Sequence, residues 1–239
     1  MKYQAILFDM DGTLVPMDTN AFIKGYFKLL FCKLSKYGFD PEQFGRNMWA
    51  GVSAMVENDG MATNEERFWQ VFCQRTGVDK DAINADCLEF YGKEFQQARQ
   101  FTGENPLAAE AVRIAREKAK TVILATNPMF PMVGQQTRMG WVNLKPSDFE
   151  LVTSYENERF CKPNPKYYLS ICQRMGLEPS QCLMIGNDEN EDMYAGTQAG
   201  LNGWLITDWM IPCQEHPWNG PKGSFAETLE MLKALEIYP

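Results

Sequence analysis

The chain has 239 residues, of which 45% are hydrophobic, so it can form one large domain or a core with a smaller insert. Its formal net charge of -8 argues against nonspecific nucleic-acid binding, although a small phosphorylated substrate needs only a local positive pocket. No apolar stretch reaches the length of a membrane span, and no signal peptide precedes the first predicted strand. Seven scattered cysteines form no CxxC pair, and we therefore expect a cytoplasmic protein with free thiols.

The first predicted strand, Tyr3–Phe8, ends directly at Asp9, and Asp11 follows two residues later. Gly12 and Thr13 then form a predicted turn that supports the two acids. Packing does not require carboxylates at the end of a buried strand, because burying an unpaired charge is unfavourable. A carboxylate can attack phosphorus, and a neighbouring acid can protonate the leaving oxygen. The pair therefore indicates phosphoryl transfer, with an ordinary turn and helix-cap role as the alternative.

The segment from Pro16 to Thr102 shows apolar residues at helical spacing and no convincing strand. It predicts four amphipathic helices, Ala21–Tyr37, Pro41–Glu57, Asn64–Thr76 and Lys80–Arg99. An all-helical insert directly after the first strand would lie over the carboxyl ends of the strands, where α/β sheets bind ligands. We therefore predict a helical cap over residues 16–102 and a core made of residues 1–15 and 103–239.

The remaining chain alternates short apolar runs with helical stretches. The predicted strands are Thr121–Ala125, Phe149–Thr153, Cys182–Ile185 and Gly203–Ile206. The predicted helices are Leu107–Lys120, Met132–Met139, Pro165–Met175 and Phe225–Leu235, and Trp209–Gly223 is predicted as a surface loop. This alternation predicts an α/β core with a Rossmann-like, doubly wound parallel sheet.

Three further groups of polar residues lie at or near the ends of predicted elements. They are Thr126-Asn127, then Lys162 before the Pro165 helix, and finally Gly186-Asn187-Asp188 with Asp192. Together with Asp9-Met10-Asp11-Gly12-Thr13, their order and spacing resemble the haloacid dehalogenase superfamily. That family has the pattern DxDGT, a strand ending in Ser or Thr, a Lys, and an acidic loop similar to GDxxxxD. The resemblance covers essentially the whole predicted core.

The resemblance implies a role for each matching residue. Asp9 would be the nucleophile, and Asp11 would protonate the leaving alcohol and later deprotonate the attacking water. Thr126 and Asn127 would bind phosphoryl oxygens, and Lys162 would offset the charges of Asp9 and the phosphate. The substrate implied is a small phosphorylated metabolite, and the protein is expected to be a monomer or a homodimer.

The same resemblance implies a Mg²⁺ cofactor, held by Asp9, the main-chain carbonyl of Asp11 and an acid of the fourth motif. This chain departs from the pattern there, because Asn187 stands where the family usually has an aspartate. We expect Asp188 to supply the anionic ligand, Asn187 to assist as a neutral ligand and Asp192 to support both.

Other reactions of the superfamily remain open at this point. Asp11 favours phosphoryl transfer over dehalogenation, because a halide leaves without a proton. A phosphonate hydrolase would need a cap lysine, and Lys24, Lys28 and Lys33 lie on the first predicted cap helix. A sugar-phosphate mutase would share all four motifs, and a catalytically silent binding protein is the alternative of a different class.

Overall fold

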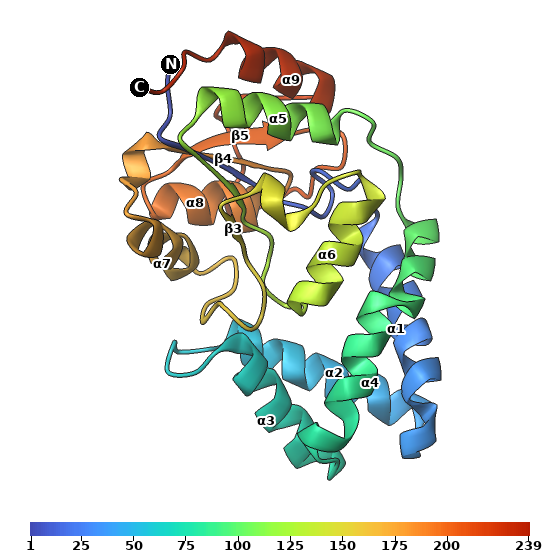
Figure 1. Cartoon of the computed structure of the whole chain (residues 1–239). Helices are drawn as coiled ribbons and strands as arrows, with labels where there is room; N and C mark the ends of the chain where they lie inside the picture. The colour runs from blue at the N-terminus through green and yellow to red at the C-terminus, as the bar shows by residue number, and fades with distance from the viewer.

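The computed structural model describes all 239 residues and contains one six-stranded parallel sheet in the order β3-β2-β1-β4-β5-β6 (Figure 1). The strands are β1 (Ala5–Phe8), β2 (Thr121–Leu124), β3 (Leu151–Val152), β4 (Cys182–Gly186), β5 (Asn202–Ile206) and β6 (Lys222–Gly223). In the central register, Phe8 pairs with both Leu124 and Ile185. The residues that follow these three strands therefore meet at one edge of the sheet. The predicted doubly wound α/β fold is confirmed.

Alternate residues of each strand point to opposite faces of the sheet. Ile6 and Phe8 join one apolar cluster with α5 (Ala108–Lys118) and α9 (Phe225–Ala234). Ala5 and Leu7 join a second cluster, which contains residues of α7 (Pro165–Met175) and α8 (Ala195–Gln198). Figure 1 shows α5 and α9 above the sheet and α7 and α8 below it. Both faces are thus covered, as a parallel sheet requires.

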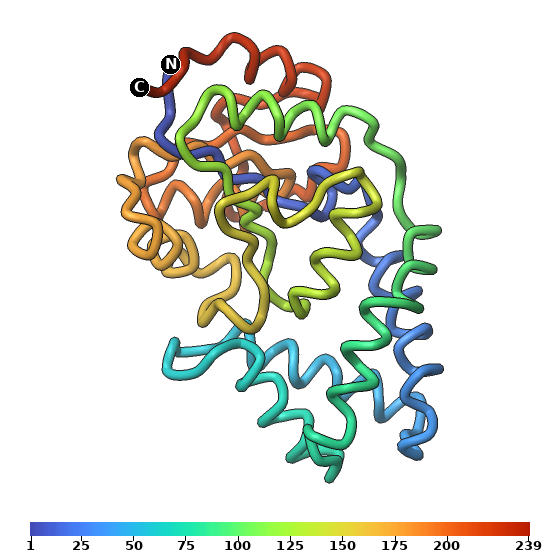
Figure 2. The backbone as a smooth tube through the Cα atoms, viewed as in Figure 1, coloured from blue at the N-terminus to red at the C-terminus, as the bar shows by residue number.

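The chain between β1 and α5 is helical. It contains α1 (Thr19–Leu34), α2 (Pro41–Val56), α3 (Asn64–Thr76), α4 (Lys80–Gly92) and the 3₁₀ segment η2 (Glu94–Phe101). Figure 2 shows this segment leaving the sheet and returning beside its own starting point. There Met17 forms an antiparallel bridge with Thr102, and the Gly103 N–H donates to the Pro16 carbonyl at 2.7 Å. The helical segment is therefore connected to the rest of the protein by two chain segments that lie side by side.

Four further elements belong to the core: α6 (Met132–Trp141), the short 3₁₀ turns η3 (Pro146–Asp148) and η4 (Pro179–Gln181), and the π-helix η5 (Glu189–Tyr194). A third 3₁₀ turn, η1 (Ser35–Tyr37), lies between α1 and α2 in the helical segment. None of the helices is both long and apolar enough to cross a membrane. All seven cysteines are free thiols.

Three predicted elements differ from the structure. The helix predicted over Lys80–Arg99 ends at Gly92, because Lys93 leaves helical geometry and the chain continues as η2, which buries Phe95 and Ala98. The strand predicted over Phe149–Thr153 is reduced to β3, an edge strand that pairs with β2 alone. The loop predicted over Trp209–Gly223 contains β6, whose two residues are too few to show a strand period.

Candidate active site

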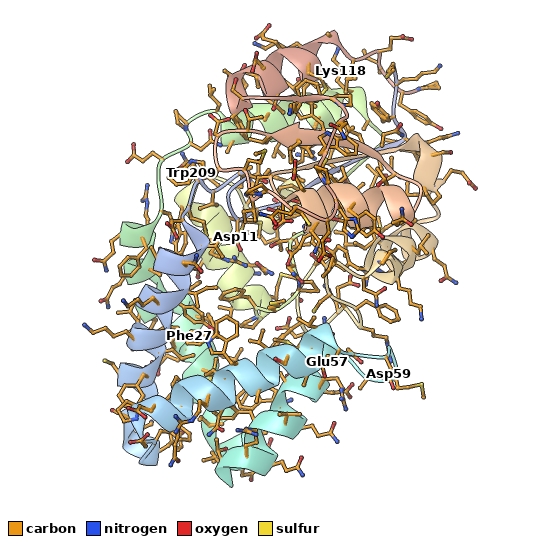
Figure 3. All side chains as sticks on the ribbon, turned by 180° about the vertical axis from the view of Figure 1, so that it is seen from behind. Asp11, Phe27, Glu57, Asp59, Lys118 and Trp209 are labelled. Atoms are coloured by element: carbon orange, nitrogen blue, oxygen red, sulfur yellow. The ribbon has the colours of Figure 1, made fainter.

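A cavity of about 260 Å³ lies at the carboxyl ends of β1, β2 and β4, against the start of α1. Figure 3 shows Asp11 at this boundary between the sheet and the helical segment. Fifteen residues line the cavity, and six are hydrophobic. The polar ones are Asp9, Asp11, Thr19, Thr126, Asn127, Asn187, Asp188, Glu191 and Asp192. The structure therefore brings residues from three of the four predicted motifs to a single cavity.

The turn after β1 joins the first motif to the fourth. The backbone N–H of Asp9 donates to the Ile185 carbonyl at 2.9 Å, which fixes Asp9 at the strand end. Gly12 has φ +83°, and a Cβ at this position would lie 2.2 Å from Asn187 Nδ2. Thr13 Oγ1 donates to Asn187 Oδ1 at 3.1 Å. Gly12 is thus required both by its backbone conformation and by the close approach of Asn187.

Lys162 lies behind the cavity lining, in contact with Asp9 and Asp192, and is 1% exposed. Its Nζ donates to Asp9 Oδ1 at 2.8 Å and to Asp192 Oδ1 at 2.6 Å. Burial acts to lower the pKa of Lys162, but Asp192 and Asp9 outweigh burial and hold the pKa well above its usual range. The ammonium group therefore stays charged and orients the Asp9 carboxylate.

Asp192 organises the loop that follows β4. Its Oδ2 accepts the backbone N–H groups of Asn187 at 3.0 Å and Asp188 at 3.1 Å. Gly186 permits this contact, since a Cβ there would lie 2.1 Å from Asp192 Oδ2. Burial raises the pKa of Asp192 to about 7, against the opposing effect of Lys162. Asp192 thus connects the lysine to the loop that carries Asn187 and Asp188.

The loop after β2 carries Thr126 and Asn127. The carbonyl of Thr126 accepts hydrogen bonds from Thr153 Oγ1 at 2.8 Å and Tyr167 Oη at 2.9 Å, while the residue lines the cavity. Asn127 Nδ2 donates to Glu191 Oε2 at 2.9 Å, and Asn127 Oδ1 is buried without a partner. These contacts fix the backbone at the place where the resemblance puts the phosphoryl group.

Two charged residues of this region were not singled out in the sequence. Glu191 lines the cavity, and burial raises its pKa to about 8. It lies in the acid-rich run Asn187–Asp192. The number of acids in this run indicates a functional loop, but the sequence does not show which side chains face the cavity. Arg138 of α6 is completely buried and donates to Asp11 Oδ2 and to Gln135 Oε1. The only sequence signal for Arg138 is that Gln135 lies three residues before it, on the same face of the helix.

The donor set is compatible with a hard divalent cation. Five carboxylates line the cavity, against the two buried cations Lys162 and Arg138. Asp9 and Asp188 each use one carboxylate oxygen in hydrogen bonds within the protein, at Oδ1 in both cases. Both amide atoms of Asn187 are already engaged, by Thr13 and by the Trp209 carbonyl. No three His, Cys, Asp or Glu side chains converge as a metal cluster, but Mg²⁺ needs only one or two carboxylates when phosphate and water complete its shell.

Comparisons with known proteins show which family and which proteins this chain resembles. Residues 3–200 match the family model described as haloacid dehalogenase-like hydrolase. Glyceraldehyde 3-phosphate phosphatase of Methanothermobacter thermautotrophicus is 34% identical, over 85% of each chain. Human N-acylneuraminate-9-phosphatase is 29% identical over 90% of this chain and 88% of its own. The crystal structure of a HAD phosphatase from Thermococcus onnurineus superposes with a TM-score of 0.62 at 18% identity, covering 99% of this chain and 100% of that one.

Proposed function

Because the chain belongs to the haloacid dehalogenase-like hydrolase family, we propose that it is a Mg²⁺-dependent phosphatase that acts through an aspartyl-phosphate. The observation that carries this proposal is the contact of the buried Lys162 Nζ with Oδ1 of Asp9, which lines the cavity. It leaves Asp9 Oδ2 without a protein hydrogen bond, beside the second acid, Asp11. The names of two relatives also specify phosphatases of small metabolites.

In the proposed reaction, Asp9 Oδ2 attacks phosphorus in line, and the bond between phosphorus and the leaving oxygen breaks. Asp11 gives its proton to that oxygen, so that a neutral alcohol departs. Water then attacks the aspartyl-phosphate, Asp11 takes a proton from it, and Asp9 is regenerated with release of phosphate. Burial raises the pKa of Asp11 while Arg138 opposes this shift, and this balance suits a group that both donates and accepts a proton.

We further propose that Asp9, the main-chain carbonyl of Asp11 and Asp188 hold Mg²⁺. When bound, the ion would supply positive charge next to the transferring phosphoryl group. The roles of the protein groups are separate: Lys162 orients Asp9, and Asp192 orients the backbone of the loop that carries Asp188.

Residues 16–102 are proposed to act as a cap. Thr19, Phe22 and Ile23, at the start of α1, line the cavity, so this segment covers the site on the side away from the sheet. The two adjacent connections at Met17 and Thr102 would allow it to move as a unit. Such motion would admit substrate and exclude water during the reaction.

A phosphonate hydrolase is less well supported. Lys24, Lys28 and Lys33 do not line the cavity. Lys33 donates to Glu89 at 2.9 Å and Glu94 at 2.7 Å, and these hydrogen bonds raise its pKa, which disfavours the neutral amine that a Schiff base requires. No feature of the structure favours a mutase or a silent binding protein.

The test is phosphate release from an aryl phosphate, measured with Mg²⁺ and with EDTA for the wild type and for Asp9→Asn. We expect metal-dependent release from the wild type and none from the variant, with circular dichroism unchanged. Release by Asp9→Asn at the wild-type rate would contradict the mechanism.

A further inference from the structure

We propose that this cavity selects phosphate monoesters of uncharged, largely apolar alcohols and discriminates against substrates with a second anionic group. This inference rests on the proposed phosphatase function, and it deepens that function by naming the substrate class. It follows from the composition of the cavity wall, the engagement of both buried cations and the packing that holds the wall in place.

The wall away from the catalytic acids is apolar. Its six hydrophobic residues come from three segments of the chain: Met17, Phe22 and Ile23 before and within α1, Met129 and Phe130 after β2, and Ile211 after β5. Thr19 is the only polar lining residue contributed by the helical segment. Since the phosphoryl group must lie at Asp9, the alcohol would contact this apolar surface and one hydroxyl.

No lysine, arginine or histidine lines the cavity. Lys162 is engaged by Asp9 and Asp192, and Arg138 by Asp11 and Gln135. A second anionic group would find no free cation here and would face carboxylates instead. Introducing an unpaired charge into such a site is unfavourable, whereas an uncharged alcohol would bury apolar area.

Aromatic packing fixes the apolar wall. The centroid of the Phe22 ring lies 6.1 Å from the ring centroid of Phe95, 6.5 Å from that of Phe130 and 6.2 Å from that of Trp141. The guanidinium carbon of Arg138 lies 4.1 Å from the centre of the Phe130 ring, so Phe130 separates this cation from the rest of the wall. A rearrangement that exposed Arg138 to a ligand would have to break this cluster and the bond to Asp11.

The deciding experiment measures binding rather than turnover. Isothermal titration calorimetry of the full chain with Mg²⁺ would compare the binding of phenylphosphonate with that of 3-carboxyphenylphosphonate. Neither ligand can be hydrolysed, and both carry the same phosphonate group. We expect the carboxylated ligand to bind about tenfold more weakly or worse, which corresponds to about 1.4 kcal/mol. Equal or tighter binding of the carboxylated ligand would overturn the inference, and so would failure of both ligands to bind.

Variants at two neighbouring positions sharpen the test. Ile23→Arg places a cation on the apolar wall and should reduce the discrimination between the two ligands about tenfold. Ile23→Gln removes the apolar side chain without adding charge and should not restore binding of the carboxylated ligand. Lys24 is exposed and lies outside the cavity, so Lys24→Ala should leave the discrimination unchanged. Discrimination lost in Lys24→Ala, or unaltered in Ile23→Arg, would contradict the proposal.

Phosphate release separates this inference from the proposed function. If the wild type binds phenylphosphonate selectively but releases no phosphate from phenyl phosphate, the phosphatase proposal fails and the ligand class stands. If phenyl phosphate and 3-carboxyphenyl phosphate are hydrolysed with equal kcat/KM, the function stands and the ligand class fails.

Discussion

The guanidinium group of Arg138 donates a hydrogen bond to the carboxylate of Asp11, and the arginine side chain is completely buried. The helix that follows β2 thus holds the acid that follows β1. Gln135 accepts a second hydrogen bond from the same guanidinium group, and Phe130 covers it. Asp11 therefore has a defined direction in the cavity, which a proton donor to a leaving group requires.

Arg138→Met should lower kcat for unactivated alkyl phosphates by about tenfold or more, since general acid catalysis contributes about 10²- to 10⁴-fold and depends on placement of the acid. The loss should be much smaller for 4-nitrophenyl phosphate, whose leaving group needs little protonation. Steady-state kinetics on the two substrate types would measure this difference. Arg138→Lys should recover part of the activity on alkyl phosphates, because it keeps the charge.

A purely structural role for Arg138 predicts a different result. Loss of fold would reduce kcat equally for both leaving groups and would lower the thermal midpoint. Equal losses on the two substrates would therefore show that Arg138 does not act through Asp11.

Lys162→Met should destabilise the protein as well as abolish turnover. The substitution leaves Asp9 and Asp192 buried without their shared cation. Removing one partner of a buried ion pair costs about 3–5 kcal/mol. Urea unfolding would measure the change, with Lys166→Met as a control because Lys166 is exposed. A Lys162→Met protein as stable as the control would show that these acids become protonated at little cost.

The sequence predicted the parts of the site that continuous apolar strands bring together. Asp9 and Thr126 each come at the end of such a strand, and the registers of β1 and β2 then place them at one edge of the sheet. The position of Lys162 followed from the order of motifs alone. Its contact with Asp192 depends on the path of the loop before α7, which no periodicity describes.

Arg138 and Glu191 show what the sequence could not supply. A charged residue on a helix is usually solvated, and the burial of Arg138 depends on how α6 is rotated about its own axis and on the packing of Phe130. Glu191 lies within a π-helix, whose wider turn changes the face on which each acid points. Element type was therefore predictable at these positions, but side-chain direction was not.

Glu158, which lies outside the cavity, should make the free energy of unfolding depend on pH. Burial raises its pKa from 4.5 to about 7, with Arg174 opposing the shift. Between these two values the folded protein holds a proton that the unfolded chain has released, so the free energy of unfolding falls as the pH rises through this range. In Glu158→Gln the side chain cannot ionise, so the decrease in unfolding free energy over this pH range should be smaller by roughly 3 kcal/mol at most.

Urea unfolding at pH 5 and pH 8 would test this, with the exposed Glu178→Gln as the control. The difference between wild type and variant isolates Glu158 from the acids of the cavity, which are the same in both proteins. An unchanged pH dependence in Glu158→Gln would show that Arg174 keeps the carboxylate ionised throughout.

Gly12→Ala should cost more than backbone strain alone. Gly12 and Gly38 both have positive φ, +83° and +74°, so alanine is strained at either position by about 1 kcal/mol. At Gly38 nothing lies within 4 Å of a new Cβ, whereas at Gly12 the Cβ would lie 2.2 Å from Asn187 Nδ2. Gly12→Ala must therefore displace Asn187 from Thr13 and from the Trp209 carbonyl. We expect a larger loss of unfolding free energy than in Gly38→Ala, and a higher Mg²⁺ concentration for half-maximal activity in Gly12→Ala alone. Equal effects of the two substitutions would show that the contact between the first and fourth motifs does not support the metal site.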